Sequence, residues 1–154
     1  MPRLCLPTLV LLAVLAPPAQ AKPAYCKKRA VQEVRVASGK PRGAGINTVL
    51  CGDVTHDGVK DAIYTVLSGG TAGPTRVGVI RGGSEVAVLR EWTGYKLTID
   101  LVNARRFDVQ QPYYDSDDPN CCPSAFDVVP YRWTGTRFKR GGSTRHKTFQ
   151  KRFR

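Results

Sequence analysis

The stretch DAIYTVLSGGTAGPTRVGVI, residues 61–80, decides the fold class of this chain. Its first part, 61–68, is rich in the β-branched and aromatic residues that strands favour. A cluster of Gly, Pro, Ser and Thr at 68–75 indicates a turn. Apolar residues then alternate along 76–83, and a glycine pair ends the segment. The stretch therefore predicts two strands joined by a turn.

The same pattern of short strands continues on both sides of this stretch. Apolar residues recur with a period of two, and turn residues separate the segments at spacings of roughly 8–12 residues. No segment shows a sustained 3.6-residue period, so a helix finds room only at 85–92 or 96–106. We expect strands at 31–36, 46–54, 61–68, 76–83, 85–92, 96–102, 105–114, 126–133 and 136–140.

This series predicts a mainly β fold, because no crossover helix for parallel βαβ units is visible. We expect an antiparallel meander that forms a curled sheet, a sandwich or a partial barrel. The alternative is an α+β fold with one short helix.

The beginning of the chain has the organisation of a secretory signal peptide. Arg3 precedes an apolar run of about a dozen residues, and Ala19 and Ala21 match the pattern that signal peptidase recognises. The run is shorter than the about 20 residues that span a bilayer, so we expect no transmembrane segment in the mature chain. We predict a secreted, extracellular or envelope-associated protein with a signal peptide at 1–21, one β-rich domain at 22–138 and a basic, disordered tail at 139–154.

The predicted export of the chain indicates that its cysteines form disulfides. Four of the five lie beyond the signal peptide, and an even number in an exported chain predicts disulfides, each worth about 2–5 kcal/mol. Of the three connectivities, we disfavour the one that joins neighbours, because it strains the intervening peptide. The other two remain open, and zinc is disfavoured because adjacent cysteines lack its usual spacing. The predicted disulfide cysteines are Cys26, Cys51, Cys121 and Cys122.

The most specific local motif is CGDVTHDGVKDAI, residues 51–63. Alternate residues of a tight loop can turn oxygens inward together, and calcium takes six to eight oxygen ligands. The segment lacks a Glu at position twelve and the exiting helix of an EF-hand. An Asp-rich turn without metal is the alternative. The predicted calcium ligands are Asp53, Thr55, Asp57, the Val59 carbonyl and Asp61.

The segment DVTHDGVKDAIYTV resembles the cation loop of FG-GAP or VCBS-type repeats of integrin-like β-propellers, although Thr55 replaces their usual carboxylate or amide. More widely, CGDVTHDGVKDAIYTV, GGTAGPTRVGV and DPNCCPSAFDVVPYRW are similar to small secreted or lipid-anchored actinobacterial proteins of uncharacterised function. The first resemblance implies a structural calcium site. The second implies export and a β-rich module, and it implies no activity.

Two further segments are candidates for binding. The acidic loop YYDSDDPNCCP at 113–123 combines rings with carboxylates, as carbohydrate sites do, and its alternative is a disulfide-pinned turn. The candidates there are Tyr113, Tyr114, Asp115, Asp117 and Asp118. The tail carries seven Lys and Arg and no acid, which indicates a solvated segment or contact with a polyanion. The candidates there are Lys139, Arg140, Arg145, Lys147, Lys151, Arg152 and Arg154.

Catalytic motifs are scarce. The two histidines lie in the acidic loop and in the tail, and no G-x-S-x-G elbow exists. We therefore expect an exported, noncatalytic binding or structural module, stabilised by calcium and associated with the envelope through an anionic wall polymer or a membrane surface. Export disfavours nucleic acid as the partner. The alternatives are a hydrolase that uses Asp100 and Asp108, and a secreted enzyme inhibitor.

Overall fold

The computed structural model describes residues 24–153, and the predicted signal peptide lies outside them. Within this range the chain forms two antiparallel sheets and one α-helix, with no closed barrel, which confirms the mainly β prediction. The elements are η1 (Ala24–Cys26), α1 (Lys28–Ala37), β1 (Gly45–Gly52), β2 (Asp61–Leu67), β3 (Pro74–Arg81), β4 (Ala87–Thr93), β5 (Thr98–Asn103), β6 (Arg106–Tyr113), β7 (Ala125–Trp133), β8 (Phe138–Arg140), β9 (Thr144–His146) and η2 (Lys151–Phe153).

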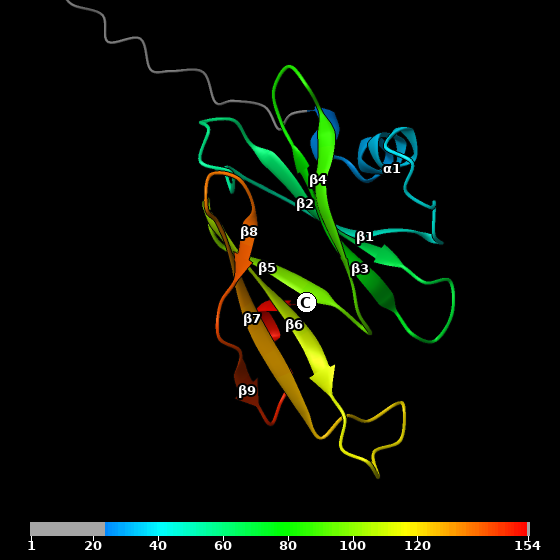
Figure 1. The fold of residues 1–154 in the computed structure, drawn as a ribbon. Helices are drawn as coiled ribbons and strands as arrows, with labels where there is room; N and C mark the ends of the chain where they lie inside the picture. Colours follow the sequence, from blue (N-terminus) through cyan, green and yellow to red (C-terminus); the bar gives the residue numbers. More distant parts are fainter. Residues whose placement is uncertain (1–23, 154) are drawn as a thin grey trace, which may run out of the picture.

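Each sheet follows the order of the chain, as a meander should. The first sheet has the order β1-β2-β3-β4, and the second has the order β5-β6-β7-β8, with β9 also pairing with β7. Figure 1 shows the two sheets one below the other, with α1 beside the first. The strand β4 is therefore an edge of the first sheet, and β8 is an edge of the second.

One hydrophobic core lies where the two sheets meet. Ile63 of β2 and Phe107 of β6 are both fully buried in this cluster, and Trp92 of β4 packs against it. The Trp92 ring centroid lies 6.0 Å from that of Phe107 and 4.8 Å from that of Tyr131. Such aromatic pairs stabilise a core beyond the area that they bury. This core therefore holds β4 against the second sheet.

A second core lies between the first sheet and α1. Tyr64 of β2 and Val31 of α1 are fully buried in it. Because successive side chains of a strand point to opposite faces, β2 supplies Ile63 to one core and Tyr64 to the other. This is why 61–66 is buried at every residue and why the sequence indicates this strand so clearly.

The predicted strand at 31–36 is wrong, because these residues belong to α1. Val31 and Val34 both pack into the second core, and their spacing of three places them on one helical face. Val36, which completes the apparent alternation, is 44% exposed. A run of six residues fits both periods, and packing against the sheet selects the helix.

The disulfide cysteines are confirmed, and the disfavoured connectivity is the one that forms. Cys26 of η1 pairs with Cys51 of β1, with a Cα–Cα distance of 6.2 Å. Cys121 pairs with its neighbour Cys122 in the connection between β6 and β7. The connection between β6 and β7 lies at the far end of the second sheet from α1 (Figure 1), and η1, which carries Cys26, packs beside α1.

The prediction of a disordered basic tail is wrong for residues 139–153. The strand β9 pairs with β7, and Phe153 of η2 is only 3% exposed. The backbone N–H of Gln150 donates to Oε1 of the buried Gln110 at 3.0 Å. The segment therefore packs across the second sheet, although its composition is that of a solvated tail.

Candidate functional site

The Asp53–Asp61 loop connects β1 to β2, and its first two carboxylates bind the loop itself. Asp53 accepts hydrogen bonds from the backbone N–H groups of Asp57 and Gly58, at 3.0 and 3.2 Å. Asp57 accepts from the N–H of Val59 and from Nε of Arg81, both at 3.0 Å. The Val59 amide, followed by Arg81, lowers the pKa of the Asp57 carboxyl.

Asp61 anchors the other end of the loop from a fully buried position. One carboxylate oxygen accepts from the N–H and the hydroxyl of Thr55, at 2.8 and 2.9 Å. The other accepts from the N–H of Gly82 at 3.2 Å, which ties the loop to the β3–β4 turn. Burial raises the pKa of Asp61, and these hydrogen bonds oppose the rise.

The predicted calcium ligands are thus close in sequence but do not form a common shell. Their oxygens face backbone amides, the Thr55 hydroxyl and Arg81. Residues 24–153 contain no cluster of three or more His, Cys, Asp or Glu arranged for a metal ion. Calcium would have to replace these hydrogen bonds, and its binding here stays a prediction.

Replacing Asp61 by asparagine is expected to lower the free energy of unfolding by about 1–3 kcal/mol. The new amide N–H₂ would face a backbone donor at Thr55 or Gly82, which leaves a buried donor unsatisfied. Urea unfolding without calcium measures this. Asp57→Asn, on the exposed side of the same loop, is the control and should change stability by less than about 0.5 kcal/mol.

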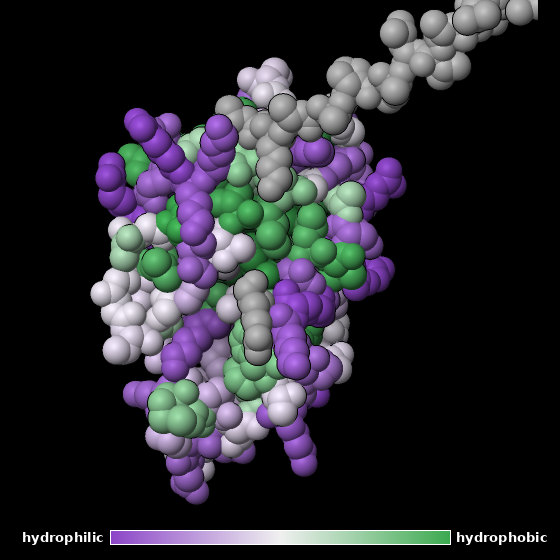
Figure 2. Space-filling model, turned by 180° about the vertical axis from the view of Figure 1, so that it is seen from behind, coloured by the Kyte–Doolittle hydropathy of each residue, from purple (hydrophilic) through white to green (hydrophobic). Residues whose placement is uncertain are grey.

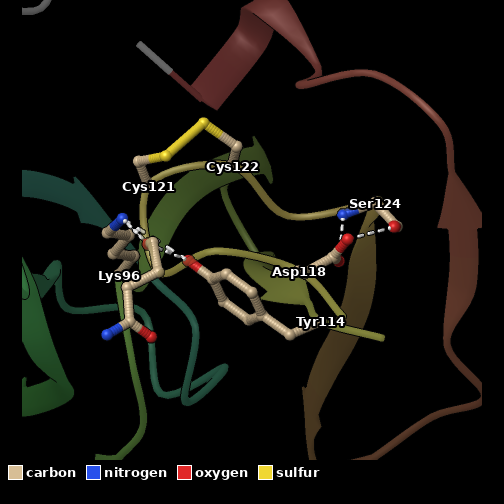
Figure 3. Close-up of a disulfide and its surroundings, with 7 residues drawn as sticks. Lys96, Tyr114, Asp118, Cys121, Cys122 and Ser124 are labelled. Carbon is tan, nitrogen blue, oxygen red and sulfur yellow. Dashed lines mark hydrogen bonds between the residues drawn. A yellow bond between two sulfur atoms is a disulfide. The ribbon is translucent and has the colours of Figure 1, made fainter. Parts of the chain in front are cut away.

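The second acidic loop holds its own conformation (Figure 3). The Tyr114 hydroxyl and Nζ of Lys96 both donate to the carbonyl of Asn120, at 2.8 and 2.7 Å. Asp118 accepts from the backbone N–H and the hydroxyl of Ser124, both at 2.7 Å. The Ser124 hydroxyl is the main reason that the pKa of Asp118 is lowered.

The remaining candidates of this loop differ in their exposure to solvent. Asp115 and Asp117 are exposed, whereas the ring of Tyr113 is covered by the guanidinium of Arg145 at 3.3 Å from its centroid. Arg145 in turn donates to Asp127 at 2.8 Å, and this bond lowers the pKa of Asp127. The loop therefore offers the Asp115 and Asp117 carboxylates to solvent, while one face of the Tyr113 ring is taken by Arg145.

The basic residues of the tail fall into two groups. Arg145 and Arg152 form ion pairs with carboxylates of the second sheet. Among the described residues, no carboxylate lies within ion-pairing distance of four exposed others, and Arg154 lies outside the described range. These four are Lys139, Arg140, Lys147 and Lys151.

Arg152 binds the two carboxylates that were considered for hydrolysis. Asp100 and Asp108 face each other in the β5–β6 register. Arg152 donates to both carboxylates, at 2.8 Å each. Asp108 is 4% exposed and lies 3.5 Å from Arg106 as well. Both carboxylates are therefore bound by arginine of the same chain, and the pair has the features of a structural ion network.

The open surface that sequence reasoning missed surrounds the β7–β8 hairpin. A groove of about 920 Å³ separates this hairpin from the edge strand β4. Its wall contains Trp133 and Phe138, whose ring centroids are 4.8 Å apart, and Trp92, whose centroid is 5.7 Å from that of Phe138. The hairpin turns at Gly135, which has a φ of 95° that favours glycine. Aromatic rings thus line a groove that is open to solvent.

Cations surround these rings. Arg90, Arg137 and Lys139 line the groove, together with the hydroxyl residues Thr134 and Thr136. A second hollow of about 460 Å³ on the same hairpin shares Trp133, Thr134 and Lys139 and adds more arginines. We call the whole region the hairpin surface: Arg90, Arg132, Trp133, Arg137, Phe138, Lys139 and Arg140.

The cations of the hairpin surface form no ion pair within the described chain, although Arg140 lies near enough to Asp127 to help lower the pKa of that carboxyl. None of its five cations lies within 4.0 Å of a carboxylate that the structure describes. The nearest acid in sequence, Glu91, points into the molecule and pairs with Arg35 and Arg76. The positive field of this surface is therefore available to an anionic ligand.

Part of the hairpin surface was visible in the sequence. The run YRWTGTRFKR alternates aromatic and basic residues around a turn, and Lys139 and Arg140 were already candidates for polyanion contact. The groove itself needs β4, which is about forty residues earlier in the chain, and only the docking of the two sheets brings it there.

Comparison with protein-family models, curated proteins and solved structures finds no match for this chain. Among residues 24–153, no helix is both long and apolar enough to cross a membrane. Hydrophilic side chains project around the face shown in Figure 2, with apolar surface between them. The geometry of the chain itself is therefore the basis for a functional proposal.

Proposed function

We propose that this chain is an exported, noncatalytic module that binds an anionic polymer of the cell envelope through the hairpin surface. The observation that carries the proposal is the gathering, around the half-buried Trp133, of five cations that form no ion pair with a carboxylate of residues 24–153. Clustered charge of one sign raises the local concentration of an oppositely charged ligand and speeds its association.

Further features support export and a binding role. The disulfides belong to an oxidising compartment, and the sequence predicts a signal peptide before them. Arg152 binds both carboxylates that a hydrolase would use, so the noncatalytic role has the better support. Export also favours a wall polymer over nucleic acid.

Charge reversal at Arg137 and Lys139 is expected to weaken binding to dextran sulfate, a polyanion probe, by about tenfold, or about 1.4 kcal/mol. Both side chains are exposed on the hairpin, so the fold should tolerate the change. Fluorescence titration at low and high salt measures the affinity. The salt dependence should become shallower in the variant, because fewer counterions are displaced.

The matched control is the double variant Lys27→Glu, Lys28→Glu at the start of α1. It makes the same change in net charge at exposed positions of the opposite sheet's helix. We expect the control to lose less than about twofold in affinity. Equal losses in the two variants would mean that net charge alone attracts the polymer and that the hairpin is not its site.

Calcium is a separate proposal for the Asp53–Asp61 loop, where it would act as a stabiliser. Thermal unfolding with calcium at about 1 mM, the range of weak extracellular sites, and with a chelator tests it. A higher Tm in calcium, absent in Asp57→Asn, would support the site. Identical curves would assign the loop to hydrogen bonding alone.

A further inference from the structure

The hairpin surface has a feature that charge alone does not require. Trp133 lines both the groove beside β4 and the second hollow, so ligand can reach the same side chain from two sides of the hairpin. Phe138 packs against Trp133 at an interplanar angle of 56° and fixes its position. Electrostatic attraction of a polyanion does not require an aromatic ring in a fixed position.

We infer that the anionic polymer is a glycan whose sugar rings carry carboxylates, an inference that rests on the proposed function. The apolar C–H face of a sugar packs against an aromatic ring, whose negative face attracts it. The planar forks of the arginine side chains around Trp133 match a carboxylate with two parallel hydrogen bonds. A sugar acid is the ligand that uses both features at once.

The hydroxyl residues of the groove fit the same ligand. Thr134 and Thr136 are exposed in the turn that follows Trp133. The Thr134 hydroxyl donates to the Arg137 carbonyl at 2.8 Å and can still accept from a ligand, whereas the Thr136 hydroxyl can donate one hydrogen bond and accept others. Sugar hydroxyls have the same capacity. Because the two hollows share Trp133, Thr134 and Lys139, the ligand is a chain that continues across the hairpin rather than a single sugar.

A lipid surface fits this region less well. The rings of Trp133 and Phe138 are half-buried in hollows between cations, where a flat bilayer does not reach them. The large apolar side chains that project most are elsewhere and are spread over the described chain: Val36, Val59, Tyr95, Val102 and Phe149. The shape of the surface therefore favours a flexible chain over a membrane.

The test compares probes that separate charge from ring faces. We would measure affinities for an oligomer of galacturonic acid, for polyphosphate of matched charge, for a single-stranded oligonucleotide and for anionic phospholipid vesicles, at one ionic strength. We expect the uronate to bind about tenfold more tightly than each of the others. Trp133→Ala should lose about tenfold for the uronate and less than about twofold for polyphosphate.

Two control variants distinguish a loss of binding from a loss of the fold. Tyr95→Ala removes an exposed ring outside the hairpin surface and should leave every affinity unchanged. Trp133→Phe keeps a ring and should recover part of the lost uronate affinity, while thermal melts confirm that each variant is folded.

The outcomes separate the two proposals. If polyphosphate, the oligonucleotide or the vesicles bind as tightly as the uronate, or if Trp133→Ala weakens uronate and polyphosphate equally, the glycan inference fails and the polyanion proposal stands. If no anionic probe binds, both fail. Selective loss of the uronate in Trp133→Ala supports both.

Discussion

Replacing Arg35 by methionine is expected to lower the free energy of unfolding by about 3–5 kcal/mol. Arg35 is fully buried in α1, and its guanidinium binds both carboxylate oxygens of Glu91 on β4, at 2.8 and 3.3 Å. The Tyr64 hydroxyl donates to the same carboxylate at 2.9 Å. Removal of the cation leaves Glu91, whose side chain is 7% exposed, with only the more distant Arg76 as a charged partner.

Urea unfolding at neutral pH measures this loss. Arg29→Met is the control on the same helix, because its side chain is 92% exposed and its bond to Glu33 is a surface pair worth about 0.3–0.5 kcal/mol. The double variant Arg35→Met, Glu91→Met should be more stable than Arg35→Met alone, since it buries no unpaired charge. A single variant as stable as Arg29→Met would show that Arg35 does not anchor the helix.

Deletion of residues 148–154 is expected to lower the free energy of unfolding by about 3 kcal/mol or more. Burial of the Phe153 ring contributes about 1.5–3 kcal/mol, and Arg152 supplies hydrogen bonds to the buried carboxylate of Asp108. Both are lost together in the truncated chain. The loss should appear as a lower urea midpoint and a lower Tm.

Two point variants locate the effect within this segment. Phe153→Ala should reproduce most of the loss, whereas Lys151→Ala, at an exposed neighbouring position, should be within about 0.5 kcal/mol of the parent. A truncated chain that unfolds at the same urea concentration as the parent would contradict the packed C-terminal segment.

The tail shows where sequence reasoning reaches its limit. Its charge density is typical of disorder, and only two phenylalanines oppose that pattern. What orders it is the outer face of the second sheet, where Asp100, Asp108 and Gln110 provide partners for Arg152 and Gln150. Such partners cannot be assigned from composition, because strand register decides which side chains share a face.

The strands were predictable for the opposite reason. Residues 61–66 are buried on both faces, so local pattern and tertiary packing agree there. The pattern failed at 31–36, where six residues fit a strand and a helix equally well and contact with the sheet decided. The cysteine pairing and the groove could not be predicted for a shared reason. Both depend on which distant segments the fold brings together or keeps apart.

The edge strand β4 contributes to both the helix contact and the groove, because its successive side chains point to opposite faces. Glu91 points to α1 and holds the helix, while its neighbours Arg90 and Trp92 line the groove on the other side. A slip of the pairing between β3 and residues 90–93 by one position would exchange the two sets of side chains between the faces. Helix docking and the proposed ligand groove therefore depend on alternate residues of the same strand, so that one error in strand pairing would disrupt both.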